Sequence, residues 1–419
     1  MKNIFLMLGF AILVLSACNK VENPELNWSD KTVDPDLISP PEPVIGSINQ
    51  FGCDIFRILN AEENEEKNLF ISPTSISLAL AMTLNGANEA TEDSMEYALR
   101  VDHLTSEEIN ETNHELIEQL TTCDTGVLLS IANSIWYRLG FPTEQDFLDM
   151  NTEYYDAQIE EVDFSDPGTV DIINGWVAEE THDRIARVIY QIPGDAIMFL
   201  INAIYFKAAW SVSFDEELTH EDDFYRNDGN KKKVDLMSSQ RIAGYFENEL
   251  LQICELDYGD GKFSMIILLP AENVELNLLI GALDPENWNG WISSLSSEIV
   301  NLELPKFTFK YEKRLNSALS DMGMDIVFTP MADFTGINPG GGLMIDYVDH
   351  FTFVEVKESG TEAAAVTVVG MVTSVNIPQE EPEIKEMKVN RPFVFVIREK
   401  TTNAIVFLGK VADPVIESQ

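Results

Sequence analysis

The first half of the chain carries apolar residues at helical spacing. Apolar positions that recur every three or four residues predict amphipathic helices over residues 75–84, 105–120, 143–155 and 170–184, after a first helix near residues 46–59. Ser72-Pro73 is typical of a capped helix start, and Asn85-Gly86 is typical of a helix end.

The second half carries strand patterns instead. Near-continuous apolar runs rich in β-branched residues predict buried strands over residues 127–136, 197–206, 264–269, 351–356, 393–397 and 404–408. Asn133 and Asn202 are unusual polar insertions in two of these runs. Helices first and strands later indicate an α+β fold with large, mostly antiparallel sheets.

The N-terminal residues have the pattern of a processing signal. Residues 1–17 combine Lys2 with an apolar run that is too short to span a membrane, so we expect a signal peptide. The run ends in Leu15-Ser-Ala-Cys18, which resembles the lipobox of bacterial lipoproteins. That resemblance implies a lipidated Cys18, and Asn19 by the same resemblance favours the outer membrane, on its periplasmic or surface face. The alternative is a plain signal peptide and a secreted, extracellular protein.

Residues 18–44 are rich in Pro, Asp, Glu and Asn and predict an extended tether. A flexible chain of about 25 residues has a root-mean-square reach of about 28 Å, enough to lift a folded body off a membrane. Residues 45–419 contain no second linker, repeat or low-complexity run, so we expect one domain.

Charge excludes several classes of partner. The chain has 71 Asp and Glu against 27 Lys and Arg, a net charge of −44. Nucleic-acid binding requires a basic surface, and heparin or an anionic lipid headgroup is disfavoured for the same reason. Residues 101–137 contain no Lys or Arg, and we interpret the one basic cluster, at residues 231–233, as a solvated turn.

No signature of an enzyme or a metal site is found. The sequence has no GxSxG, HExxH, P-loop or GxGxxG motif, and its five histidines are scattered, so we expect neither catalysis nor a metal or cofactor. Beyond Cys18 there are three widely spaced cysteines, Cys53, Cys123 and Cys254. We expect buried, unpaired thiols, although the sequence leaves one disulfide bridge open.

Residues 358–378 are small, β-branched and almost uncharged in a strongly acidic chain. Strand side chains alternate between two faces. One alternating set runs from Thr361 through Ala363 to Thr373 without a charge, and the other contains Glu362, the only ionisable residue of 361–378. Pro378 to Glu383 nevertheless has the composition of an exposed loop. We interpret this segment as one that can switch between a loop and a buried strand.

Here the sequence resembles the serpin family of protease inhibitors. Gly360-Thr-Glu-Ala-Ala-Ala365 is similar to the hinge of inhibitory serpins, and Asn68 to Ser77, Asn202 to Trp210, Leu304 to Phe307 and Arg391 to Glu399 are similar to family blocks in family order. The resemblance implies a metastable fold of three β-sheets and about nine helices, with a reactive-centre loop at about 358–384. It also implies that a protease cleaves this loop, which then inserts into the main sheet and traps the acyl-enzyme.

Family spacing from the hinge implies a scissile bond between Ser374 and Val375. Thr373 precedes it, after Met371 and Val372, and the longer stretch behind the hinge leaves cleavage one or two residues earlier open. Because no Arg, Lys or bulky aromatic residue lies here, we expect elastase-like or subtilisin-like serine proteases as targets. Papain-like cysteine proteases are a second class.

The resemblance assigns further residues by position. The hinge comprises Gly360, Thr361, Glu362, Ala363, Ala364 and Ala365. A polar cluster under the main sheet comprises Ser72, Ser75, Asn202 and His350, and Trp210 lies where insertion begins. Each of these could instead be a cap or an ordinary core residue. We expect a monomer that heparin does not stimulate. The alternative function is a non-inhibitory serpin-fold binding or scaffold protein, which the small hinge residues disfavour.

Overall fold

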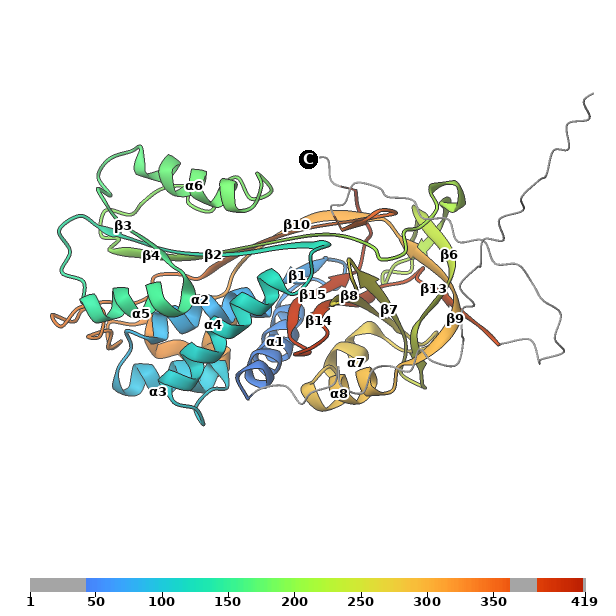
Figure 1. The fold of residues 1–419 in the computed structure, drawn as a ribbon, viewed down its shortest axis with the longest axis horizontal. Coiled ribbons are helices and arrows are strands. Elements are labelled where there is room, and N and C mark those ends of the chain that lie inside the picture. The colour runs from blue at the N-terminus through green and yellow to red at the C-terminus, as the bar shows by residue number, and fades with distance from the viewer. Residues whose placement is uncertain (1–42, 362–382, 417–419) are drawn as a thin grey trace, which may run out of the picture.

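The structure, a computed structural model, describes residues 43–361 and 383–416. Its helices are α1 (Pro43–Glu62), α2 (Pro73–Leu84), α3 (Glu89–Leu99), α4 (Ser106–Thr122), α5 (Gln145–Tyr155), α6 (Thr169–Glu180), α7 (Leu276–Gly281), α8 (Pro285–Ser293) and α9 (Asn316–Leu319). Figure 1 shows α6 on one side of the sheet that contains β2 and β4, and α2, α4 and α5 on the other.

The described part of the chain also contains fifteen strands. They are β1 (Leu69–Ile71), β2 (Val127–Arg138), β3 (Gln158–Val162), β4 (Met198–Ala209), β5 (His220–Tyr225), β6 (Lys231–Glu247), β7 (Leu251–Tyr258), β8 (Phe263–Pro270), β9 (Ser296–Pro305), β10 (Phe307–Arg314), β11 (Asp349–Lys357), β12 (Gly360–Thr361), β13 (Ile384–Lys388), β14 (Phe393–Glu399) and β15 (Ile405–Val411).

These strands form two hydrogen-bonded sheets. The six-stranded sheet has the order β10-β11-β12-β4-β2-β3, and the nine-stranded sheet runs from β1 through β15, β14, β8, β7, β6 and β9 to β13, with β5 beside β6. We expected three sheets. The 17-residue β6 pairs with β5 and β9 and then with β7, so one continuous strand joins what would otherwise be two sheets.

The expected helices and strands form close to their predicted bounds. The Ser72 hydroxyl caps α2 by accepting a hydrogen bond from the Ser75 backbone, and Thr105 and Glu108 form a capping box at α4. The α+β class is confirmed. The first helix begins at Pro43, so the folded part includes two residues that we assigned to the tether.

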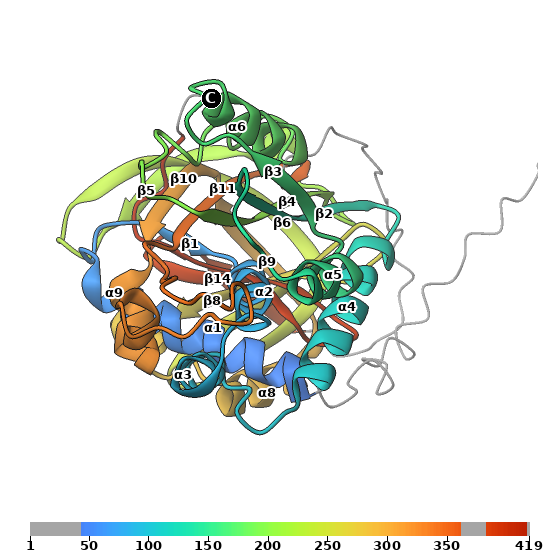
Figure 2. The ribbon, with the colours of Figure 1, turned by 90° about the vertical axis from the view of Figure 1, so that its left-hand side faces the viewer.

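The largest part of the core lies between the two sheets. Strands β8, β14 and β15 are buried along their whole length, and α2 packs between β4 and β15. Figure 2 shows α2 enclosed by strands and helices, unlike the more peripheral α4 and α6. Almost every residue of α2 is buried, because the helix contacts β4 of one sheet and β15 of the other.

One sequence interpretation is wrong. Residues 231–233 begin β6 instead of forming a turn, and all three lysines are ion-paired: Lys231 and Lys233 with Asp223, and Lys232 with Asp413. The cluster is therefore ion-paired with acids of β5 and of the C-terminal segment.

The three cysteines of the described chain are unpaired, as expected, and burial raises the pKa of Cys53 and Cys254 to about 12. Within the described ranges, no helix is long and apolar enough to cross a membrane. One group, His220, Asp222 and Glu303, has the spacing of metal ligands, but the Lys388 ammonium lies 2.6 Å from Asp222 and 2.7 Å from Glu303 and forms an ion pair with each.

Candidate functional site

The first two hinge residues already form a strand inside the six-stranded sheet. Gly360 and Thr361 make up β12, which is antiparallel to β4 on one side and to β11 on the other. Gly360 has φ +139°, and a Cβ atom at this position would lie 2.2 Å from the Ala208 carbonyl oxygen. Only glycine fits here, because the backbone conformation is unfavourable for other residues and the space is closed.

Thr361 points into the core, as the alternation of the sequence indicated. Its side chain is buried, and its hydroxyl lies 2.6 Å from the phenol oxygen of Tyr258 at the end of β7. Burial raises the pKa of Tyr258, so the phenol stays neutral. No charged group takes part in this hydrogen bond, and a cation at position 361 would lose its hydration without gaining a partner.

Trp210 packs beside the hinge. Its indole stacks on the Tyr258 ring with the centroids 4.4 Å apart, and its Nε1 donates a hydrogen bond to the Lys357 carbonyl at 2.9 Å. The Trp210 backbone N–H donates to the Ser359 carbonyl at 3.1 Å. The indole therefore holds the turn between β11 and β12 as well as the sheet below it.

An ion pair at this turn was not anticipated from the sequence. The buried carboxylate of Glu358 lies 3.0 Å from Lys306 Nζ and accepts a hydrogen bond from the Thr219 hydroxyl at 2.9 Å. Burial acts to raise the pKa of Glu358, but its hydrogen bonds outweigh burial and hold the pKa below the usual range. Glu358 lies in the almost uncharged segment 358–378 and Lys306 in the block from Leu304 to Phe307, both noted in the sequence. No local pattern in either segment indicates that the two side chains meet.

The structure brings the four polar residues assigned under the sheet into one network. His350 Nε2 accepts a hydrogen bond from the Ser72 backbone at 3.1 Å, and the Ser72 hydroxyl donates to the Val406 carbonyl at 2.7 Å. The Ser75 hydroxyl donates to Asn202 Oδ1. Burial lowers the pKa of His350 to about 3, so the imidazole is neutral and free to accept.

The two asparagines that interrupt the apolar runs are hydrogen-bonded to each other. Asn133 of β2 and Asn202 of β4 are opposite in the ladder, and Asn202 Nδ2 donates to Asn133 Oδ1 at 2.6 Å. Asn133 in turn donates to the Tyr155 carbonyl at 2.7 Å, which ties the sheet to the end of α5. These hydrogen bonds leave the polar residues of two buried strands satisfied.

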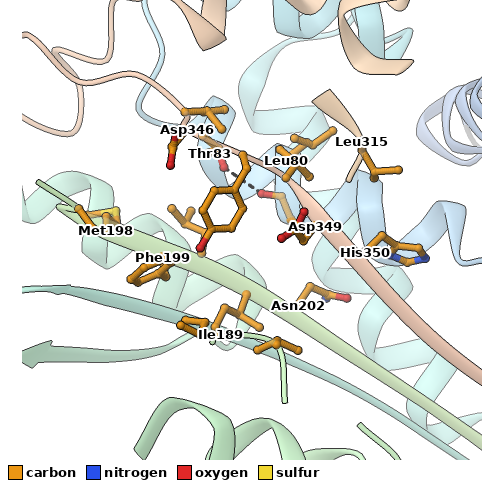
Figure 3. Close-up of a pocket in the computed structure, with 18 of the residues that line it drawn as sticks. Leu80, Thr83, Ile189, Met198, Phe199, Asn202, Leu315, Asp346, Asp349 and His350 are labelled. Atoms are coloured by element: carbon orange, nitrogen blue, oxygen red, sulfur yellow. Dashed lines mark hydrogen bonds between the residues drawn. The ribbon is translucent and has the colours of Figure 1, made fainter. Parts of the chain in front are cut away.

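Beyond β12, the described part of the sheet has a gap. Among residues 43–361 and 383–416, β4 and β11 are joined only through β12, and a cavity of about 480 Å³ lies farther along, lined by residues 198–203 of β4 and 349–351 of β11. Figure 3 shows Met198, Asn202 and His350 around this cavity, with Leu80 of α2 behind it. The cavity is mainly apolar and continues the line of the hinge.

The remaining assigned residues lie outside the described residues. They are Glu362, Ala363, Ala364 and Ala365 of the hinge, Met371, Val372 and Thr373, the predicted scissile bond between Ser374 and Val375, and Cys18 with the predicted signal peptide.

Comparisons with known proteins agree with this geometry. Residues 46–414 match the family model for serpins, described as serine protease inhibitors. The chain is 33% identical over 379 residues to an uncharacterized serpin-like protein of Thermococcus kodakarensis, covering 89% of this chain and 86% of that protein. It is 34% identical over 377 residues to the leukocyte elastase inhibitor of Sus scrofa, covering 87% and 98%.

Among solved structures, the thermophilic serpin tengpin in its native state matches with a TM-score of 0.80 and 34% identity, over 90% of this chain and 95% of that one. Tengpin in its latent state matches with a TM-score of 0.75 and 30% identity, over 92% and 100%. The matched length and the two relatives above 30% identity establish that this chain belongs to the serpin family.

Proposed function

We propose that this protein is a suicide-substrate inhibitor of serine endopeptidases with shallow specificity pockets, elastase-like or subtilisin-like. The protease serine attacks the Ser374 carbonyl, forms an ester and releases the amino group of Val375. The loop then enters the six-stranded sheet before water hydrolyses the ester. A relative named leukocyte elastase inhibitor supports this class of target.

The observation that carries the proposal is the register of β12. Thr361 pairs with Ala208 of β4 and Val356 of β11. Continued without a break, the same register places residues 362–371 opposite residues 207–198 of β4. It places residues 362–368 opposite residues 355–349 of β11. Each new backbone hydrogen bond contributes about 1 kcal/mol net, so extending the strand is favourable.

The side chains that would enter suit their neighbours on β4 and β11. Ala363 and Ala365 share the inward face with Thr361 and would lie beside Phe206 and Ile204, which are buried and large. Thr367 would arrive between Asn202 and His350, where its hydroxyl meets a polar neighbourhood. Glu362 belongs to the outward set, so its charge stays in water.

The test is capture of protease by two variants that carry the same new cation. Incubation of the parent with an elastase-like protease should give an adduct that survives SDS. Thr361→Arg places the cation on the inward face and should abolish the adduct, leaving cleaved chain and active protease. Glu362→Arg, the matched control, places it on the outward face and should retain most of the capture. Equal capture by both variants contradicts insertion.

The cleavage position has its own readout. Intact-mass analysis after brief exposure to the protease should find the new termini at Ser374 and Val375. Cleavage outside residues 371–375 contradicts the assigned bond without contradicting insertion.

We further propose that Cys18 is lipidated and tethers the domain to a bacterial cell envelope. The support is the sequence of residues 1–18. Metabolic labelling with a fatty-acid analogue should mark the parent and leave Cys18→Ser unlabelled. Label in Cys18→Ser contradicts this anchor.

A further inference from the structure

We propose that three isoleucines beside the C-terminal end of the reactive loop form a docking surface for the body of the attacking protease. This surface, the isoleucine row, comprises Ile242 of β6, Ile299 of β9 and Ile384 of β13. It rests on the proposed function for its partner, because the protease is the molecule that the loop brings to this face.

The row is fixed by strand register. Ile242 is opposite Ile299, and Ile384 is opposite Ile299 from the other side, so all three side chains share one face. Ile242 and Ile384 are each 44% exposed, and Ile299 is half-buried between them. Neighbouring strands lie about 4.8 Å apart, so the row makes an apolar strip about 10 Å across.

The next rows on the same face are polar. Gln240 donates to Asn301 at 2.9 Å, and Asn301 donates to Glu386 at 2.6 Å, so an amide–carboxylate row borders the isoleucines. The row after that holds Glu303 and Lys388, whose charges lie 2.7 Å apart. Single exposed apolar residues are common on surfaces, but an apolar centre bordered by polar groups has the anatomy of a binding interface.

The position of the row selects the partner. Ile384 is the first residue of β13, nine residues after the predicted scissile bond, and nine extended residues span at most about 30 Å. A protease domain of about 240 residues has a radius of gyration of about 18 Å. A protease bound at residues 371–375 is therefore held within reach of the row.

Charge specifies the face of the protease that fits. Glu386 lies two residues after Ile384 on the same face, is exposed, and accepts its hydrogen bond from the neutral Asn301 amide at 2.6 Å. This carboxylate gives the border of the row a negative charge. The complementary partner is a protease with an apolar patch bordered by basic residues next to its active-site cleft.

The experiment measures the second-order rate of loop engagement, counted as adduct plus cleaved chain, with an elastase-like protease. The double variant Ile242→Thr, Ile384→Thr keeps β-branched side chains on both strands and removes the apolar surface. We expect its rate to fall about 10-fold, with the ratio of adduct to cleaved chain unchanged. Leu139→Thr is the control and should keep the parent rate. Leu139 is 60% exposed beside β2, about 40 Å along that strand from the hinge end.

A parent rate in the double variant overturns the proposal. Concentration-dependent dimers of the parent that the double variant abolishes, with its rate unchanged, also overturn it and assign the row to a second copy of this chain. A parent that is only cleaved, with no adduct, contradicts the inhibitor function instead. The rate comparison still tests the row in that case, because docking precedes trapping.

Discussion

Two parts of the same pair of strands differ in how they are held. At the hinge end, β12 joins β4 to β11, and Tyr258 and Trp210 pack closely beside it. Farther along, the same strands border a cavity of about 480 Å³. Under the proposed function, a cleaved loop would continue along the open end the pairing that β12 shows at the closed end. The described residues of β12 are therefore the start of a strand that the register of the sheet can extend.

The largest effect should come from the closest contact at the closed end. Gly360→Ala places a methyl group against the Ala208 carbonyl in an unfavourable backbone conformation, and we expect the free energy of unfolding to fall by about 3 kcal/mol. Gly290→Ala is the control. Gly290 lies in α8 with nothing within 4 Å of an added Cβ, so this change should stabilise the protein slightly. Urea unfolding measures both, and equal effects would show that the hinge is not tightly held.

A smaller loss is expected when the hydrogen bond to the hinge is removed. Tyr258→Phe leaves the buried Thr361 hydroxyl without its partner, and we expect a loss of about 2 kcal/mol. The matched control is Tyr311→Phe, because the buried Tyr311 hydroxyl has no hydrogen-bond partner among the described residues and its removal should be nearly neutral. Similar losses in both variants would mean that ring packing, and not the hinge contact, sets the cost.

The open end should respond to acid. The folded pKa of His350 is about 3, below the 6.5 of the free side chain, so the unfolded state binds a proton that the native state does not. Stability from this residue is complete above about pH 6.5 and falls as the pH drops toward 3. By linkage the loss reaches about 1.4 kcal/mol at pH 5.5. His350→Gln should remove this part of the pH dependence in urea titrations at pH 7.5 and 5.5. An unchanged pH dependence would contradict a buried, neutral imidazole.

The smallest effect separates the two states of the loop. Thr367→Val should leave the intact protein unchanged. It should lower the stability of the loop-cleaved protein by about 1 kcal/mol, because only the inserted hydroxyl would meet Asn202 and His350. Thermal unfolding of both forms gives the comparison. A loss in the intact protein alone would place Thr367 in a native-state contact instead.

Much of the closed end could be predicted from local pattern. Alternation alone placed Thr361 on the buried face, and the polar insertions Asn133 and Asn202 marked two central strands. The partners could not be predicted, because Tyr258 is 103 residues from Thr361 in sequence and no spacing rule joins them. The contact between Glu358 and Lys306 could not be predicted either, because the arrangement of the sheet, and not a sequence spacing, brings them together. Helices α7 and α8 were missed because they are short, and α3 because its sequence is mostly polar.

The central claim is that the open half of the sheet accepts the cleaved loop. The most direct measurement is the thermal unfolding midpoint before and after cleavage within residues 371–375. Filling the register along β4 adds about ten strand positions, and we expect the midpoint to rise by at least about 10 °C. The same cleavage in Thr361→Arg should give no rise. A midpoint that falls or stays constant after cleavage of the parent would contradict insertion.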